Sequence, residues 1–79
     1  MARRLHNWSY RELTGFLKKN GFTFFKELGG SHQAWIKRGE DGNSDKIVGL
    51  HFTHSTYSIG TMKRMIRESG IEERLWIKR

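Results

Sequence analysis

The first amphipathic segment of the chain begins at a helix-capping sequence. Ser9 stands three residues before Glu12, which is the spacing of a capping box. The apolar side chains that follow recur at helical spacing: Leu13, Phe16 and Leu17. Asn20-Gly21 then supplies the residues that commonly end a helix. The pattern predicts a helix over residues 10–20.

Three β-favouring segments follow this helix, separated by glycine-containing turns. Residues 22–28, 32–37 and 46–53 are rich in aromatic and aliphatic side chains, and each is predicted to be a strand. Gly29-Gly30-Ser31 forms the first turn, and residues 39–45 form a polar loop. Alternation divides the third strand into two faces: Val48, Leu50 and Phe52 on one, and Ile47, Gly49 and His51 on the other.

A second helix and a short tail complete the pattern. The apolar side chains again recur at helical spacing: Ile59, Met62 and Ile66. Ser58 is a suitable N-cap before them, and Gly70 suits the left-handed position that closes a helix. The tail, residues 71–79, either docks on the fold as an extra element or waits for a partner.

The order of these elements indicates an α+β domain. One helix, three strands and a second helix pack most economically as a three-stranded antiparallel sheet with both helices on one face. This α-β-β-β-α order resembles that of a double-stranded-RNA-binding domain, an analogy that by itself concerns the fold alone.

Composition limits the classes of function. Seventy-nine residues form one small domain, too small for a multidomain enzyme or a large cofactor pocket. The absence of cysteine excludes disulfides, a thiolate nucleophile and a cysteine zinc site. No apolar run approaches the ~18 residues of a membrane span, so we expect a cytoplasmic protein.

Charge favours a polyanionic partner. Lys and Arg number 15 against 8 Asp and Glu, a net charge of +7. The basic residues form three groups: Lys18 and Lys19 at the end of the first helix, Lys37 and Arg38 at the end of the second strand, and Lys63, Arg64 and Arg67 on the second helix. Such a distribution suits contacts to several phosphates. A solvated surface is the alternative, but the excess exceeds what solubility requires, and nucleic acid is favoured.

Four histidines are present, and their spacing indicates no metal site. None are separated by the four residues of a zinc-binding helix, and no carboxylate accompanies them in a cluster. His6 lies in the N-terminal extension and is taken as incidental. His51 is interpreted as a structural or surface histidine, whereas His54, where the third strand ends, is open to a ligand.

His32 is the candidate catalytic residue. It follows a glycine turn, and an imidazole, whose ordinary pKa is about 6.5, can transfer protons at neutral pH. Next to an RNA phosphodiester it can accept the proton of the 2′-hydroxyl or donate a proton to the leaving 5′-oxygen. Alternation, however, places it on the strand face of Ala34 and Ile36, which we expect to be buried unless the strand begins at Gln33.

Two motifs resemble the HicA toxins, the RNA-cleaving halves of bacterial toxin–antitoxin pairs. The first is Gly30-Ser31-His32 followed by an aromatic strand, and the second is the segment 60–71 with its Gly-Thr start and Gly-Ile end. The opening helix running into Leu17-Lys-Lys-Asn-Gly-Phe22 is similar as well. The resemblance covers residues 9–71, and we divide the chain into a basic extension (1–8), this domain, and a tail (72–79).

The resemblance implies a metal-independent mRNA interferase with no cofactor and a HicB-type antitoxin as partner. His32 occupies the position of the family's catalytic histidine. Eight residues are candidates for contact with RNA: Gly30, Ser31, Lys37, Arg38, His54, Lys63, Arg64 and Arg67.

Two questions stay open at this point. A single histidine cannot be acid and base at the same instant, and the sequence does not rank His54, Lys37 and Lys63 as the second group. The function is open as well. Besides a ribonuclease, the sequence is compatible with a non-catalytic RNA-binding module that uses the same basic face, or with an adaptor that binds an acidic protein.

Overall fold

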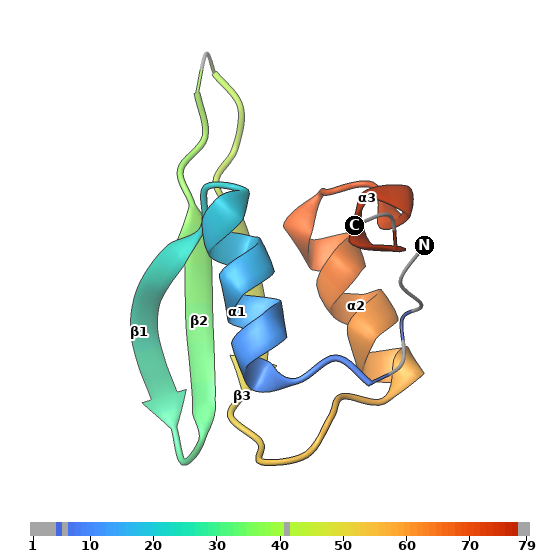
Figure 1. Cartoon of the computed structure of the whole chain (residues 1–79). Coiled ribbons are helices and arrows are strands. Elements are labelled where there is room, and N and C mark those ends of the chain that lie inside the picture. The colour runs from blue at the N-terminus through green and yellow to red at the C-terminus, as the bar shows by residue number, and fades with distance from the viewer. Residues whose placement is uncertain (1–4, 6, 41, 78–79) are drawn as a thin grey trace.

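The computed structural model describes residues 5, 7–40 and 42–77 of the chain (Figure 1). The elements follow the order α1 (Tyr10–Lys19), β1 (Thr23–Gly29), β2 (His32–Lys37), β3 (Lys46–His51), α2 (Ile59–Ser69) and α3 (Glu73–Ile77). The strands form one antiparallel sheet in the order β1-β2-β3, and α1 and α2 pack against it. The predicted α+β class is confirmed. Within the described ranges, no helix is long and apolar enough to cross a membrane.

The predicted capping box begins α1. The Glu12 backbone N–H donates to Ser9 Oγ at 3.2 Å, and the Ser9 N–H donates to Glu12 Oε1 at 3.0 Å. At the other end, the backbone N–H of Asn20 donates to carbonyls of the last turn. Because both ends are satisfied by the expected residues, the observed helix differs from the predicted one by a single residue.

The helices cover the sheet face that carries Trp35, Val48 and Leu50. These three side chains are 4% exposed or less and belong to the hydrophobic core. Trp35 and Val48 are partners across β2 and β3, so they share a face. The Lys18 ammonium of α1 lies 5.7 Å from the centre of the Trp35 ring, which places that helix over this face.

His32, Ala34 and Ile36 occupy the opposite face, on which Ala34 and Ile36 are buried as expected while His32 is exposed. The strand begins at His32 rather than at Gln33, and Trp35 is the β2 side chain that enters the helical core. Ala34 and Ile36 are 4% and 5% exposed but lie outside that core cluster. His32 therefore lies at the exposed end of the face opposite the one that carries Trp35.

The third strand is shorter than predicted. It ends at His51 instead of residue 53, and Phe52, expected beside the buried Leu50, is 40% exposed. The Phe52 ring packs edge-on against Tyr10, with centroids 4.9 Å apart. Its backbone N–H donates to the Ser31 carbonyl at 2.9 Å, which holds the end of β3 beside the β1–β2 turn.

The tail docks on the domain as α3. Trp76 is fully buried, with its ring centroid 5.5 Å from that of Trp8 and 4.4 Å from that of Phe16. All three contribute to the packing of the hydrophobic core. Residues on both sides of the 9–71 segment therefore join the core of the domain.

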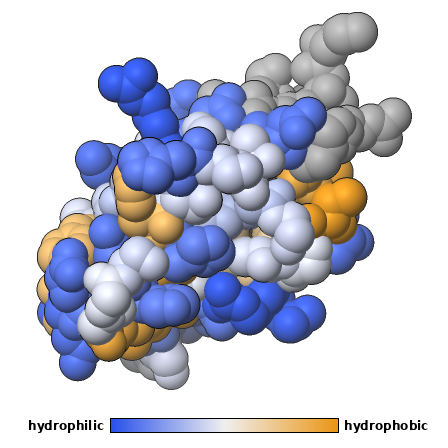
Figure 2. Space-filling view, turned by 90° about the horizontal axis from the view of Figure 1, so that it is seen from below, coloured by the Kyte–Doolittle hydropathy of each residue, from blue (hydrophilic) through white to orange (hydrophobic). Residues whose placement is uncertain are grey.

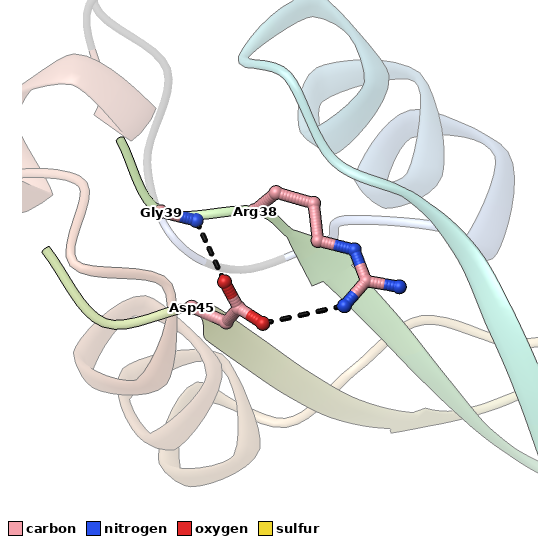
Figure 3. Close-up of polar contacts among 3 residues, drawn as sticks. All are labelled: Arg38, Gly39 and Asp45. Carbon is pink, nitrogen blue, oxygen red and sulfur yellow. Dashed lines mark hydrogen bonds and ion pairs between the residues drawn. The ribbon is translucent and has the colours of Figure 1, made fainter. Parts of the chain in front are cut away.

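An aspartate closes the loop between β2 and β3 (Figure 3). Asp45 accepts the Gly39 backbone N–H at 2.7 Å and the Arg38 Nη1 at 3.3 Å. The Gly39 bond is the main cause that lowers the pKa of Asp45; desolvation opposes it in part, and the hydrogen bond and charge of Arg38 add to the lowering. A Cβ at Gly39 would collide with the Asn43 backbone, so the loop requires glycine there.

Candidate active site

The β1–β2 turn presents Gly30-Ser31-His32 at one end of the sheet. Gly29 and Gly30 have φ angles of 110° and 56°, which residues with a Cβ rarely adopt. Gly29 pairs with His32, which leaves a two-residue loop with glycine in its first position, as type II′ turns prefer. The tight turn thus explains the glycines, and both Ser31 and His32 are exposed.

His32 and His51 form a cross-strand pair, which we call the imidazole pair. They are register partners on β2 and β3, and their ring centroids are 6.1 Å apart with an interplanar angle of 55°. His32 is exposed and His51 is partly buried. The sequence interpretation gave His51 no functional role, but the structure places it beside the catalytic candidate.

Tyr57 supports His51 from the connection between β3 and α2. Its ring lies edge-on to the His51 imidazole at 5.2 Å, and its hydroxyl donates to the His51 carbonyl at 2.6 Å. Burial raises the pKa of Tyr57 to about 12, and neighbouring Tyr10 adds to the shift. The hydroxyl therefore stays protonated at neutral pH and keeps this bond.

His54 lies near the imidazole pair in the chain, at the same end of the sheet. Its exposed ring packs edge-on against Phe52, with centroids 4.8 Å apart. Since Phe52 follows His51 directly, His54 is placed beside the end of β3. The His54 side chain therefore has an aromatic contact and is still exposed, so a ligand can reach it.

Arg64 is the predicted RNA-binding residue that the structure brings to the sheet near the imidazole pair. Its Nη1 would be 4.0 Å from a Cβ built at Gly49, which by alternation points to the same face as His51. Glu68 anchors this approach: it accepts the Gly49 backbone N–H at 3.0 Å and pairs with Arg64 at 2.9 Å. Two residues along a strand span roughly 7 Å, so Gly49, beside the guanidinium, lies about that far from His51 along β3.

The two remaining candidates on α2 differ in their partners. Lys63 Nζ lies 3.9 Å from Glu73 Oε1, an ion pair that joins α2 to α3. Arg67 is exposed and forms no ion pair within the part of the chain that the structure describes. Its guanidinium is therefore available to a phosphate.

Lys37 and Arg38 lie at the other end of the sheet from His32. Lys37 is five positions along β2 from His32, which corresponds to roughly 17 Å. The Lys37 side chain passes close to Gly21 on the helix-covered side, and Arg38 pairs with Asp45 and lies over the Phe25 ring at 5.5 Å. The structure therefore does not bring these two cations to the imidazole pair.

A separate groove lies at the end of the sheet that carries Lys37 and Arg38. It has a volume of about 600 Å³, and its lining includes Lys37, Arg38 and Lys46 together with the end of α2. The positive side chains give the groove a character suited to phosphate, but it is distinct from the surface around His32.

The end of the molecule that carries the β1–β2 turn is shown in Figure 2. Its surface is largely hydrophilic, with apolar patches toward the margins, one of them on the β1 side. The large apolar side chains exposed on β1 are Phe24, Phe25 and Leu28. The candidate site thus lies at a largely hydrophilic end of the molecule.

The side chains at the site suit proton transfer at a phosphodiester. They comprise two imidazoles, a nearby guanidinium and the backbone of a glycine turn, with no carboxylate in the pair itself. No group of three or more potential metal ligands gathers in the described ranges.

No protein-family model, curated protein or solved structure matches this chain. A functional conclusion therefore depends on the site geometry and on the two motifs of the sequence.

Proposed function

We propose that this protein is an endoribonuclease of the HicA type that cleaves mRNA by acid–base catalysis with His32. The observation that carries the proposal is the exposed His32 imidazole at a tight turn, on the sheet face that the Arg64 guanidinium also approaches. An imidazole transfers protons near neutral pH, and a guanidinium stabilises the charge that develops on phosphate.

The proposed reaction uses the 2′-hydroxyl of the RNA as nucleophile. Its oxygen forms a bond to the adjacent phosphorus, and the bond between phosphorus and the 5′-oxygen breaks. A base accepts the 2′-hydroxyl proton, and an acid donates a proton to the 5′-oxygen. The products are a 2′,3′-cyclic phosphate and a 5′-hydroxyl, and His32 performs one of the two transfers.

The RNA-binding candidates would contact the substrate at different distances from the cleaved bond. Near the imidazole pair these are Gly30, Ser31, His54 and Arg64. Lys63 and Arg67 extend the basic surface along α2, and Lys37 and Arg38 would meet phosphates several nucleotides away. Distributed phosphate contacts of this kind position a strand without reading its bases.

The Gly30-Ser31-His32 motif and the 60–71 segment support assignment to a toxin–antitoxin pair, with a HicB-type antitoxin as partner. The turn and α2, on which these segments fall, are the elements that form the candidate site. The proposed chemistry needs no cofactor, because the transferred protons belong to side chains and to RNA.

End-group analysis of the products tests this proposal. The wild-type protein is incubated in EDTA with a single-stranded RNA of mixed sequence and with the same strand made of DNA. We expect RNA fragments with 2′,3′-cyclic phosphate and 5′-hydroxyl ends, and no cleavage of DNA. A free 3′-hydroxyl on the upstream fragment would contradict the 2′-hydroxyl route, and tight binding without any cleavage would favour a non-catalytic RNA-binding module.

A further inference from the structure

His32 and His51 form the type of cross-strand pair in which side chains approach most closely. The Phe52 N–H donates to the Ser31 carbonyl just beyond the pair, and the Gly49 N–H turns outward to Glu68. This pattern makes His32 and His51 a non-hydrogen-bonded pair, with Cα atoms only ~4.5 Å apart. Both rings therefore project from the same face of the sheet with centroids 6.1 Å apart.

This separation suits a phosphate held between the two imidazoles. Hydrogen bonds from ring nitrogens to phosphate oxygens span about 2.7–3.2 Å, so a phosphate bonded to both rings is compatible with centroids this far apart. His32 is exposed, whereas His51 is held from behind by the Tyr57 ring and by the hydroxyl bond to its carbonyl. One imidazole is thus restrained by its surroundings and the other is open to solvent.

The other candidates for a second group are less well placed. Lys37 lies at the far end of β2, and its side chain passes along the helix-covered side. Lys63 is engaged with Glu73 of α3. His54 packs against Phe52 beyond the strand, whereas His51 is the register partner of His32, with its ring centroid 6.1 Å away.

We propose that His51 is the second acid–base catalyst, so that His32 and His51 act as a pair on one phosphodiester. One imidazole removes the proton from the 2′-hydroxyl, and the other, in its protonated form, gives a proton to the departing 5′-oxygen. After release of the products the pair carries the opposite protonation, and exchange with water restores it. This inference rests on the proposed ribonuclease activity, to which it adds a residue and a division of roles.

Two RNA substrates test the division of roles. The first is an ordinary RNA, and the second carries sulfur in place of the bridging 5′-oxygen at one linkage. A thiol has a pKa of about 8.5, so the sulfur leaves without a proton from an acid. We expect His32→Ala and His51→Ala each to cleave the ordinary RNA at least 100-fold more slowly, a typical effect of losing general acid or base catalysis.

On the sulfur substrate, we expect one variant to regain near-wild-type cleavage and the other to stay slow. The variant that is rescued identifies the acid, and the variant that stays slow identifies the base. If neither is rescued, or both are, the proposed pairing is wrong. His51→Gln, which keeps a side chain of similar volume against Tyr57, checks that a loss in His51→Ala is chemical, and circular dichroism checks the fold of each variant.

The outcomes separate this inference from the proposed function. Normal cleavage by His51→Ala together with loss in His32→Ala would overturn the pairing and leave the ribonuclease assignment intact. Absence of cleavage by the wild type would remove the ribonuclease assignment and the pairing with it. His6→Ala removes a histidine that has no assigned role, and this control is expected to cleave both substrates as the wild type does.

Discussion

Trp76 of α3 packs edge-on against Trp8, which precedes α1, with ring centroids 5.5 Å apart. Both side chains are fully buried, and Phe16 of α1 completes the cluster 4.4 Å from the Trp76 ring. The two ends of the described chain are thus joined by aromatic packing, which adds a large buried area to a small core. The tail is a structural part of the domain.

Replacement of Trp76 by alanine is expected to destabilise the protein strongly. Loss of a buried tryptophan removes its burial and leaves a cavity, at a cost of about 3–5 kcal/mol in the free energy of unfolding. Urea denaturation followed by circular dichroism measures this change. Leu75→Ala, on the same helix but 40% exposed, is the matched control and should cost far less. Equal effects of the two substitutions would show that α3 does not pack as described.

The clamp formed by Asp45 predicts a pH-dependent contribution to stability. The Gly39 N–H and Arg38 lower the pKa of Asp45 in the folded protein, so this stabilisation is present above the ordinary carboxyl pKa of about 3.9. It is lost as the pH falls through the lowered folded value. Thermal unfolding should therefore give a higher Tm for the wild type than for Asp45→Asn at pH 7, with the gap closing below about pH 4.

Glu40→Gln is the control for the Asp45 clamp. It removes a carboxylate from the same loop that forms no ion pair within the described part of the chain. Its Tm is expected to stay near that of the wild type at pH 7. A gap between wild type and Asp45→Asn that persists unchanged at low pH would refute the ionic origin of the clamp.

Replacement of Arg67 by alanine is expected to change the salt dependence of RNA binding. Its guanidinium is exposed and carries no ion pair among the described residues, so a phosphate contact would release counterions. Arg67→Ala should weaken binding several-fold and reduce the slope of log affinity against log salt by about 0.7. Arg74→Ala removes an exposed arginine of the short α3 that is paired with Glu72. This control should leave the slope unchanged. Fluorescence anisotropy over a salt series measures both.

The fold could be predicted from the sequence largely because local signals coincide with the element ends. The Ser9–Glu12 capping box and Gly70, which takes φ of 72° at the end of α2, both lie where the pattern placed them. The face of β2 that packs against the helices could not be predicted in this way. Alternation defines two faces, but whether Trp35 or the Ala34 and Ile36 pair enters the core depends on packing against α1.

The candidate site could be predicted only in part. The motif around His32 was evident in the sequence. The register that places Lys37 opposite Lys46, and therefore His32 opposite His51, is seen only in the structure, although pairing the predicted strand ends would have given it. The approach of Arg64 depends on tertiary structure, because it brings α2 beside Gly49 of β3 and is held by Glu68, one helical turn away. The separation of Arg38 from His32 follows from the length of β2.

Comparison of cleavage and binding by the wild type and His32→Ala tests the central claim most directly. A labelled single-stranded RNA is incubated with each protein in EDTA, and affinity is measured on a non-cleavable 2′-deoxy version of the strand. We predict that His32→Ala binds the strand nearly as well as the wild type but cleaves RNA at least 100-fold more slowly. Equal cleavage by the two proteins, with both folded, would contradict a catalytic role for His32.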